Sequence, residues 1–89
     1  MAQIRVSINN RRGLHARAAS RLVQVASGFH SEVRLAFDDK QADGKNIMSV
    51  MMLAASPGSE ILLEVCGEDE EAALAAILEL IEQRFDEDE

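Results

Sequence analysis

The hydrophobic pattern changes from the period of a strand to that of a helix within one short stretch, residues 13–17 (Gly-Leu-His-Ala-Arg). Before it, residues 3–8 alternate apolar and polar side chains, which predicts a strand with one buried face. After it, apolar side chains recur at helical spacing until Gly28 stops them, which predicts a helix. The chain must therefore pass from strand to helix through a short connection, and Gly13 gives the backbone the freedom for a sharp turn.

His15 lies at the start of this expected helix. The first turn of a helix has free N–H groups and carries the positive end of the helix dipole, so it attracts anions. Arg17, two residues later, adds a planar guanidinium whose geometry suits phosphate oxygens. An imidazole beside such a site indicates a histidine that accepts a phosphoryl group. Position alone leaves two other interpretations open, a surface histidine and a weak helix cap.

Composition restricts the class of protein. A chain of 89 residues with 47% hydrophobic and 28% charged residues is typical of one globular domain, here spanning residues 1–89. The single cysteine, Cys66, cannot form an internal disulfide, which favours a reducing compartment. No apolar run has the length of a signal peptide or of a transmembrane helix. We therefore expect a cytoplasmic protein with no segment inserted in a membrane.

Charge is segregated along the chain, whose formal net charge is −7. Residues 1–21 contain five arginines and no acidic residue, whereas residues 68–89 contain ten acidic residues and one arginine. The basic part surrounds His15, and its field favours a phosphate or an acidic partner surface. The acidic total and the lack of interleaved aromatic and basic residues argue against binding of nucleic acid. At the acidic end we expect a solvated helix face and then a frayed tail over residues 86–89.

The complete pattern predicts four strands and three helices in the order β-α-β-β-α-β-α. The expected strands span residues 3–8, 32–37, 40–43 and 60–66, the third of them at an edge. The expected helices run from about 16 to 26, from 47 to 54 or 55 after an Asn46 cap, and from 69 or 70 onward. The residues expected to face the core are Ile4, Val6, Ile8, Ala18, Ala19, Leu22, Val23, Ala26, Ile61, Leu63, Val65, Ala73, Leu74, Ile77, Ile81 and Phe85.

Two helix surfaces are candidates for contact with a partner. The first is the polar face of the first helix, which carries Arg17, Ser20, Arg21 and Gln24. Arg17 and Arg21 are four residues apart on this face, and two like charges at that spacing do not stabilise a helix, which favours a functional role. The second is the short helix, whose apolar stripe suits either the core or an adaptable contact. The stripe is Met48, Met51 and Met52, and the residues that could offer the contact are Ile47, Met48 and Met51. No side chains have the spacing of a metal site, and His30 has no metal-ligating neighbour, so we expect no metal and no cofactor.

The element order, with Gly-Leu-His-Ala-Arg at the first strand–helix junction, resembles the histidine-containing phosphocarrier (HPr) family. A second match is residues 44–51 (Gly-Lys-Asn-Ile-Met-Ser-Val-Met), at the spacing where that family has its short second helix. The resemblance covers the whole chain. It implies an α+β fold, an open-faced two-layer sandwich in which a four-stranded antiparallel sheet of order 1-4-2-3 carries three helices on one face.

The resemblance also implies a phosphocarrier of the phosphotransferase system and not an enzyme with turnover of its own. His15 would accept a phosphoryl group on Nδ1 from phosphorylated Enzyme I and pass it to a histidine of an Enzyme IIA-type acceptor. The backbone N–H groups of Ala16 and Arg17 and the Arg17 guanidinium would hold the phosphate. We expect a monomer, whose partner surface would comprise Ser20, Arg21, Gln24, Ile47, Met48 and Met51.

Within the family, the sequence is most similar to the nitrogen-branch members (NPr). That similarity rests on residues 70–77 and 85–88, and on Asn46, which lies where sugar-branch carriers of Gram-positive bacteria have a regulatory serine. Ala18 lies where many members have proline, and Ser49 and Met52 replace small residues of the second helix. Two alternatives remain: a sugar-branch HPr that serves carbohydrate uptake, and a binding module that never carries phosphate.

Overall fold

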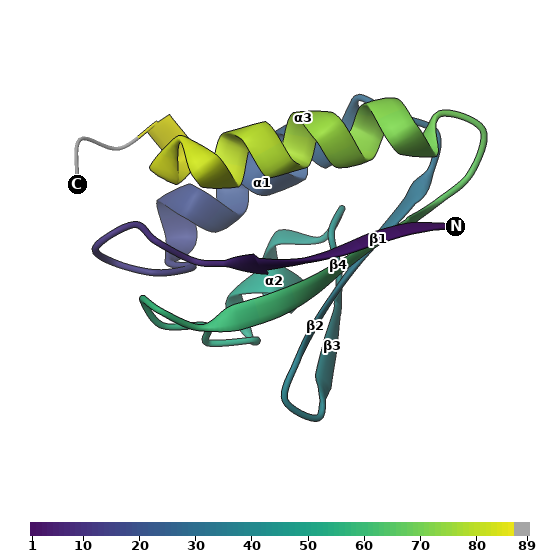
Figure 1. Cartoon of the computed structure of the whole chain (residues 1–89). Helices are drawn as coiled ribbons and strands as arrows, with labels where there is room; N and C mark the ends of the chain where they lie inside the picture. Colours follow the sequence, from purple (N-terminus) through teal and green to yellow (C-terminus); the bar gives the residue numbers. More distant parts are fainter. Residues whose placement is uncertain (87–89) are drawn as a thin grey trace.

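Two layers form the molecule, a sheet and the helices that cover one of its faces (Figure 1). The computed structural model describes residues 1–86 of the chain. The strands are β1 (Ala2–Ser7), β2 (Glu32–Phe37), β3 (Lys40–Asp43) and β4 (Glu60–Cys66). The helices are α1 (Ala16–Ser27), α2 (Ile47–Met51) and α3 (Glu70–Glu82), followed by a short 3-10 turn, η1 (Arg84–Asp86).

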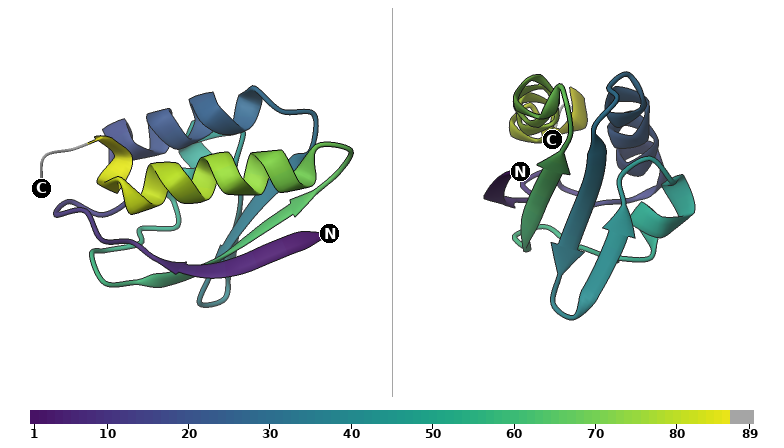
Figure 2. Two further views of the ribbon diagram at one scale, coloured as in Figure 1. Left: turned by 45° about the horizontal axis from the view of Figure 1, so that its top comes forward. Right: turned by 90° about the vertical axis from the view of Figure 1, so that its right-hand side faces the viewer.

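The sheet is antiparallel with the order β1-β4-β2-β3, which confirms the expected topology and the edge position of the third strand. Helices α1 and α3 lie side by side across one face, and α2 packs against α1 and β3 (Figure 2). Leu63 of the central strand β4 pairs with Ile4 on one side and with Leu35 on the other. Ile61, Leu63 and Val65 are fully buried, as their alternation in the sequence predicts.

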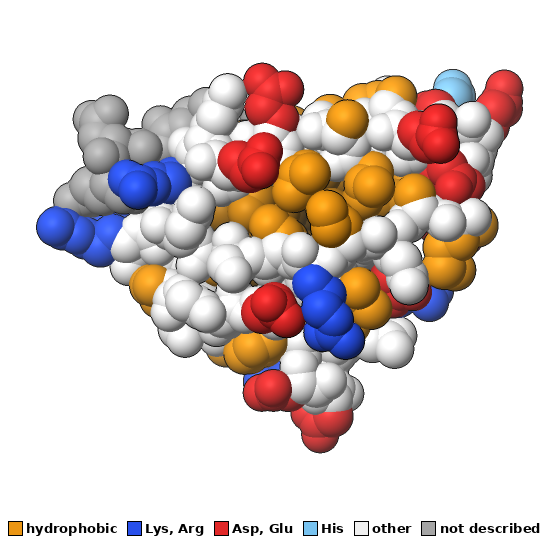
Figure 3. Space-filling view, viewed as in Figure 1, with side chains coloured by type: hydrophobic (Ala, Val, Ile, Leu, Met, Phe, Trp, Pro, Cys, Tyr) orange, Lys and Arg blue, Asp and Glu red, His pale blue; other side chains and the backbone are white. Residues whose placement is uncertain are grey.

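The exposure of β1 differs from the prediction. Ile4 was expected to face the core, but 37% of its surface is exposed, and Val6 is only half-buried. Because β1 is an edge strand, it has a neighbour on one side only, and α3 covers part of its inner face. Hydrophobic side chains gather between α3 and β1 on the surface in Figure 3. The prediction of a buried Ile4 was therefore wrong.

Helix α2 is shorter than expected. It ends at Met51, whereas the pattern predicted a helix to residue 54 or 55. Ala54 has a positive φ of 54°, which lies outside the range of a right-handed α-helix. This turn directs Leu53 and Ala55 into the core, where both are buried. Burial of these two side chains therefore ends the helix earlier than the sequence pattern indicates.

The end of the chain's last helix also differs. Phe85 is fully buried as predicted, but it belongs to η1 and not to α3, which ends at Glu82. Arg84 and Phe85 both have a φ of 57°, so the chain turns sharply to bring the ring into the core. The Nη1 atom of Arg21 donates a hydrogen bond to the Phe85 carbonyl and fixes this turn on α1. Residue 86, the first of the expected tail, belongs to η1, and residues 87–89 of that tail lie outside the described residues.

Several smaller differences concern the helix faces. Val23 and Leu74, expected in the core, are half-buried, while Leu80, which was not predicted, is buried. The remaining expected core residues of α1 and α3 are fully buried.

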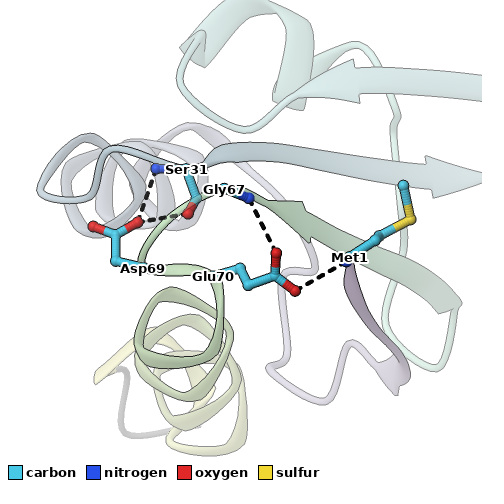
Figure 4. A network of polar contacts seen from close by, with 5 residues as sticks. All are labelled: Met1, Ser31, Gly67, Asp69 and Glu70. Carbon is cyan, nitrogen blue, oxygen red and sulfur yellow. Dashed lines mark hydrogen bonds and ion pairs between the residues drawn. The ribbon is translucent and has the colours of Figure 1, made fainter.

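A polar network joins the connections at the end of the sheet where β4 finishes (Figure 4). The Asp69 carboxylate accepts hydrogen bonds from the backbone N–H groups of His30 and Ser31, both at 2.9 Å, and from the Ser31 hydroxyl at 2.5 Å. These bonds, the hydroxyl's above all, lower the pKa of Asp69 to about 2. The neighbouring Glu70 accepts from the N–H of Gly67 at 3.2 Å, which lowers the pKa of that carboxyl. The network thus ties the α1–β2 connection to the start of α3.

Candidate functional site

The connection between β1 and α1 is fixed by backbone contacts. Gly13 has a φ of +68°, and a Cβ atom there would lie 2.5 Å from the Ala55 carbonyl oxygen and 3.1 Å from Pro57 Cδ. Next to it, the N–H of Leu14 donates to the same Ala55 carbonyl at 2.9 Å. The buried Asn10 closes the loop from inside, since its Nδ2 donates to the Gly13 carbonyl at 2.8 Å. Position 13 therefore requires glycine, as the sequence predicted, and the turn after α2 supports the loop.

His15 is the N-cap residue of α1. Its backbone is extended, with φ −80° and ψ −178°, and its carbonyl accepts the first helical hydrogen bond, from the N–H of Ala19 at 2.8 Å. Its side-chain Nδ1 accepts a hydrogen bond from the N–H of Arg17 at 3.2 Å. The side chain is half-buried. The histidine thus lies at the mouth of the helix, as expected, and it also acts as the cap that the sequence left open as an alternative.

This hydrogen bond defines the state of the imidazole ring. An Nδ1 atom that accepts an N–H must carry a lone pair, so in this arrangement any ring proton is on Nε2. The lone pair lies in the plane of the ring and is the nucleophilic site of a neutral imidazole. When the ring turns away, the N–H of Arg17 becomes available to another acceptor. The arrangement therefore combines a nucleophile with a donor that can serve an anion.

The start of α1 has no acidic side chain in its first turn to neutralise the positive end of its dipole. Ala16 and Arg17 are its first two helical residues, so their N–H groups have no carbonyl partner within the helix. The Arg17 side chain is exposed, and within residues 1–86 its guanidinium makes no ion pair. These groups together can bind an anion next to His15.

The two predicted partner surfaces are only partly exposed. On α1, Arg17 and Gln24 are exposed, whereas Ser20 and Arg21 are half-buried. The guanidinium of Arg21 donates a hydrogen bond to the Phe85 carbonyl. The expectation that a pair of arginines gains nothing structural here was wrong for Arg21, which fixes the C-terminal turn. Its partner lies 64 residues away in the chain, so no local pattern could have revealed the contact.

On α2, the exposed side chains are apolar. Asn46 caps the helix as predicted, with Oδ1 accepting from the N–H of Ser49 at 3.0 Å. Ile47 is 38% exposed and Met48 is 62% exposed, whereas Met51 is half-buried and packs against the core. Met52, which was not among the predicted partner residues, is 72% exposed. Its position four residues after Met48 was the available signal, since such residues share a helix face.

Other features of the described residues do not point to a different site. No helix within residues 1–86 is long and apolar enough to cross a membrane. In the same part of the chain, no three His, Cys, Asp or Glu side chains are arranged to hold a metal ion. A hollow of about 520 Å³ lies where the outward-facing side chains of Arg34, Glu64 and Cys66 meet, and it contains none of the predicted site residues.

Comparisons with known proteins agree with this fold. Residues 2–83 match the family described as "PTS HPr component phosphorylation site". The phosphocarrier protein HPr of Cupriavidus necator is 48% identical over 89 residues, covering 100% of both chains. The protein of the same name from Pseudomonas aeruginosa is 47% identical over 90 residues, again covering 100% of both. A crystal structure of HPr from Thermoanaerobacter tengcongensis superposes with a TM-score of 0.95 at 40% identity, over 100% of both chains.

The fold and these matches define the class of the protein, a phosphocarrier and not an enzyme. More specifically, the chain belongs to the HPr family of the phosphotransferase system.

Proposed function

We propose that this phosphocarrier accepts a phosphoryl group on Nδ1 of His15 from phosphorylated Enzyme I and passes it to an Enzyme IIA-type protein in the regulatory nitrogen branch. The observation that supports it most directly is the hydrogen bond from the Arg17 N–H to Nδ1 at the start of α1. It supports the proposal because an Nδ1 atom that accepts this bond has the lone pair that the attack needs, and the N–H beside it could donate to an anion.

In the proposed step, the Nδ1 lone pair attacks phosphorus while the bond between phosphorus and the donor group of Enzyme I breaks. Phosphoryl transfer depends mainly on in-line positioning and on stabilisation of the charged oxygens. Once Nδ1 carries phosphorus, it no longer accepts the N–H of Arg17, and that N–H is free to donate to a phosphate oxygen. The N–H of Ala16 and the Arg17 guanidinium complete the phosphate site. In the next step, a histidine of the acceptor attacks the phosphorus and the bond to Nδ1 breaks. Nδ1 can then again accept the hydrogen bond from the Arg17 N–H.

The proposed partner surface combines the exposed face of α1 with α2, which packs against it. Arg17, Ser20, Arg21 and Gln24 form the polar part, and Ile47, Met48 and Met51 the apolar part. An apolar centre with a polar rim is the common anatomy of a protein–protein interface. Met52 extends the apolar part, because 72% of its surface is exposed.

We also propose that the protein acts as a monomer in the cytoplasm. The free and exposed Cys66 is compatible with a reducing compartment. A monomer would leave the faces of α1 and α2 open to two successive partners.

The assignment to the nitrogen branch rests on the sequence of residues 70–77 and 85–88 and on Asn46. Its side chain caps α2 at the position where Gram-positive sugar-branch carriers have a regulatory serine, so a kinase specific for that serine finds no hydroxyl here. The similar proteins from Cupriavidus necator and Pseudomonas aeruginosa are named HPr without a branch. The sugar branch is therefore the competing assignment.

The test is phosphoryl uptake from phosphoenolpyruvate and Enzyme I, with His15→Ala beside the wild type. The wild type should gain one phosphate that is labile to acid, and His15→Ala should gain none. Uptake by His15→Ala would move the acceptor to another residue. No uptake by the wild type from either branch's Enzyme I would favour a binding module that carries no phosphate.

A further inference from the structure

Helix α2 and its C-cap residue expose two methionine side chains to solvent. Met48 is 62% exposed and Met52 is 72% exposed, although methionine is among the residues most often buried in globular proteins. Met52, the C-cap residue of α2, is four positions after Met48, so the two lie on the same side of the helix. The helix cannot easily withdraw them, because Asn46 caps it and the Ser49 hydroxyl accepts a hydrogen bond from the N–H of Asp43 in β3 at 3.0 Å.

We propose that Met48 and Met52 are sites of reversible oxidation by peroxides, and that their oxidation weakens docking of this protein on its phosphoryl donor. The second part rests on the proposed function, because it uses the partner surface formed by α1 and α2. The first part rests only on exposure and chemistry.

The chemistry needs no group beyond the peroxide. The sulfur lone pair attacks one peroxide oxygen, an S–O bond forms, and the O–O bond breaks. The sulfur loses two electrons and becomes a sulfoxide, while the other oxygen leaves with a proton as water. A methionine sulfoxide reductase with a thiol reductant reverses the change, releasing the oxygen as water and converting two thiols to a disulfide.

Exposure predicts which sulfurs react first. Peroxide must reach the sulfur lone pair, and Met51 is half-buried against the core. Met48 and Met52 should therefore be oxidised before Met51. Met1 is equally open at 72%, but it lies at the end of β1 that pairs with Val65, away from His15. Cys66 lies on the outward face of the sheet, opposite the helices, so its oxidation should not alter the α2 surface.

Oxidation changes the character of the proposed contact and not the fold. The sulfoxide oxygen is a strong hydrogen-bond acceptor, and an apolar interface would bury it without a partner. Both side chains are largely in solvent in the free protein, so their oxidation removes little from the core. The free domain should therefore keep its circular dichroism spectrum and melting temperature.

The experiment uses the full chain with Cys66→Ser throughout, so that thiol oxidation is excluded. Samples are treated briefly with hydrogen peroxide, and the oxidised residues are located by peptide mass spectrometry. Phosphoryl uptake from phosphorylated Enzyme I is then measured, each variant being compared with its own untreated sample. The variants are Met48→Leu with Met52→Leu, which removes both sulfurs, and the matched Met51→Leu.

We expect Met48 and Met52 to be oxidised before Met51, and the treated parent to lose about tenfold in kcat/KM, chiefly through KM. Sulfoxide reductase should restore the rate. The double leucine variant should keep its own rate after treatment, while Met51→Leu should lose as much as the parent.

Two results would overturn the inference: a treated parent that transfers at its untreated rate, or a double leucine variant that loses as much as the parent. Oxidation of Met51 ahead of Met48 would overturn the claim about exposure. If the untreated protein takes up no phosphate, the proposed function fails, and the peptide mapping still decides the oxidation sites.

Discussion

His15 is positioned by the backbone that follows it, because the N–H of Arg17 holds Nδ1 at 3.2 Å. The Arg17 side chain would have a separate task, since its guanidinium is exposed and could approach the phosphate of the proposed carrier from solvent. In the proposed transfer, the backbone of residue 17 would orient the nucleophile, and its side chain would contribute charge. Substitution at position 17 changes the second contribution and leaves the first.

Arg17→Ala should therefore fold normally and slow phosphoryl uptake on the order of tenfold to a hundredfold, because a charge-assisted contact to the transferring group is lost. Arg17→Lys should recover part of the rate, since the charge returns but the two-pronged geometry does not. Uptake kinetics from phosphorylated Enzyme I measure both. Equal rates for the three proteins would remove the guanidinium from the mechanism.

Met48→Asp tests the apolar part of the partner surface. Because Met48 is 62% exposed, the substitution should not disturb the core, but it places a charge where the partner binds. We expect Enzyme I affinity to fall on the order of tenfold with an unchanged melting temperature. Titration calorimetry gives the affinity, and Gln3→Asp on the outward face of β1 is the control. Unchanged affinity would place the docking surface elsewhere.

At the scale of elements, α2 is a helix of five residues whose stability depends on its cap. An isolated helix of this length does not persist in water, so the Asn46 side chain and the packing of Val50 must hold it. Asn46 thus has a structural role in α2.

Asn46→Ser should change the free energy of unfolding only slightly, because serine is also a good N-cap, whereas Asn46→Ala should cost about 1 kcal/mol. Urea denaturation of the three proteins provides the comparison. If Asn46→Ser lowered the free energy of unfolding as much as Asn46→Ala, Asn46 would stabilise the protein by a contact other than its cap.

The elements could be predicted where the signal is local. The strands follow from alternation, Gly13 from its turn, and Asn46 from its place before an apolar stripe. The ends of α2 and α3 could not, because Ala54 and Phe85 adopt positive φ angles so that distant parts of the core can close. For the candidate site, the position of His15 at the start of a helix could be predicted from the sequence. The hydrogen bond from Arg21 to the Phe85 carbonyl could not, because it joins residues that only the fold brings together.

At the scale of the whole molecule, the network around Asp69 links stability to pH. Its pKa is about 2 in the folded protein and 3.8 for an ordinary aspartate, so the folded state holds the ionised form more strongly. This contribution is complete above the ordinary pKa and is lost as the pH falls from about 4 toward 2. The domain should therefore become less stable across that window.

Asp69→Asn should lower the melting temperature near neutral pH, and the difference from wild type should shrink as the pH approaches about 2. Thermal melts along a pH series measure it, with Glu71→Gln as an exposed control in the first turn of α3. A difference that stays constant with pH would show that the carboxylate's charge has no part in the network.

The assignment to a branch is also a property of the whole surface. A few altered contacts around His15, each worth about 1 kcal/mol, would give a preference on the order of tenfold. Uptake from the nitrogen-branch Enzyme I should therefore exceed uptake from the sugar-branch enzyme when both are measured side by side. Faster uptake from the sugar-branch enzyme would move the protein to that branch without changing the proposed acceptor.

The hydrogen bond between the Arg17 N–H and Nδ1 would affect how readily the proposed carrier gives up its phosphoryl group. A phosphoryl carrier works only if its phosphorylated and unphosphorylated states differ little in free energy. If either state were much more stable, phosphoryl transfer would stop there. Here the same N–H has an acceptor when the histidine is empty and would exchange it for a phosphate oxygen when the histidine is loaded. Loading would thus swap one hydrogen bond for another and create little net attraction. The phosphoryl group would keep most of its transfer potential, so transfer to and from His15 could be reversible.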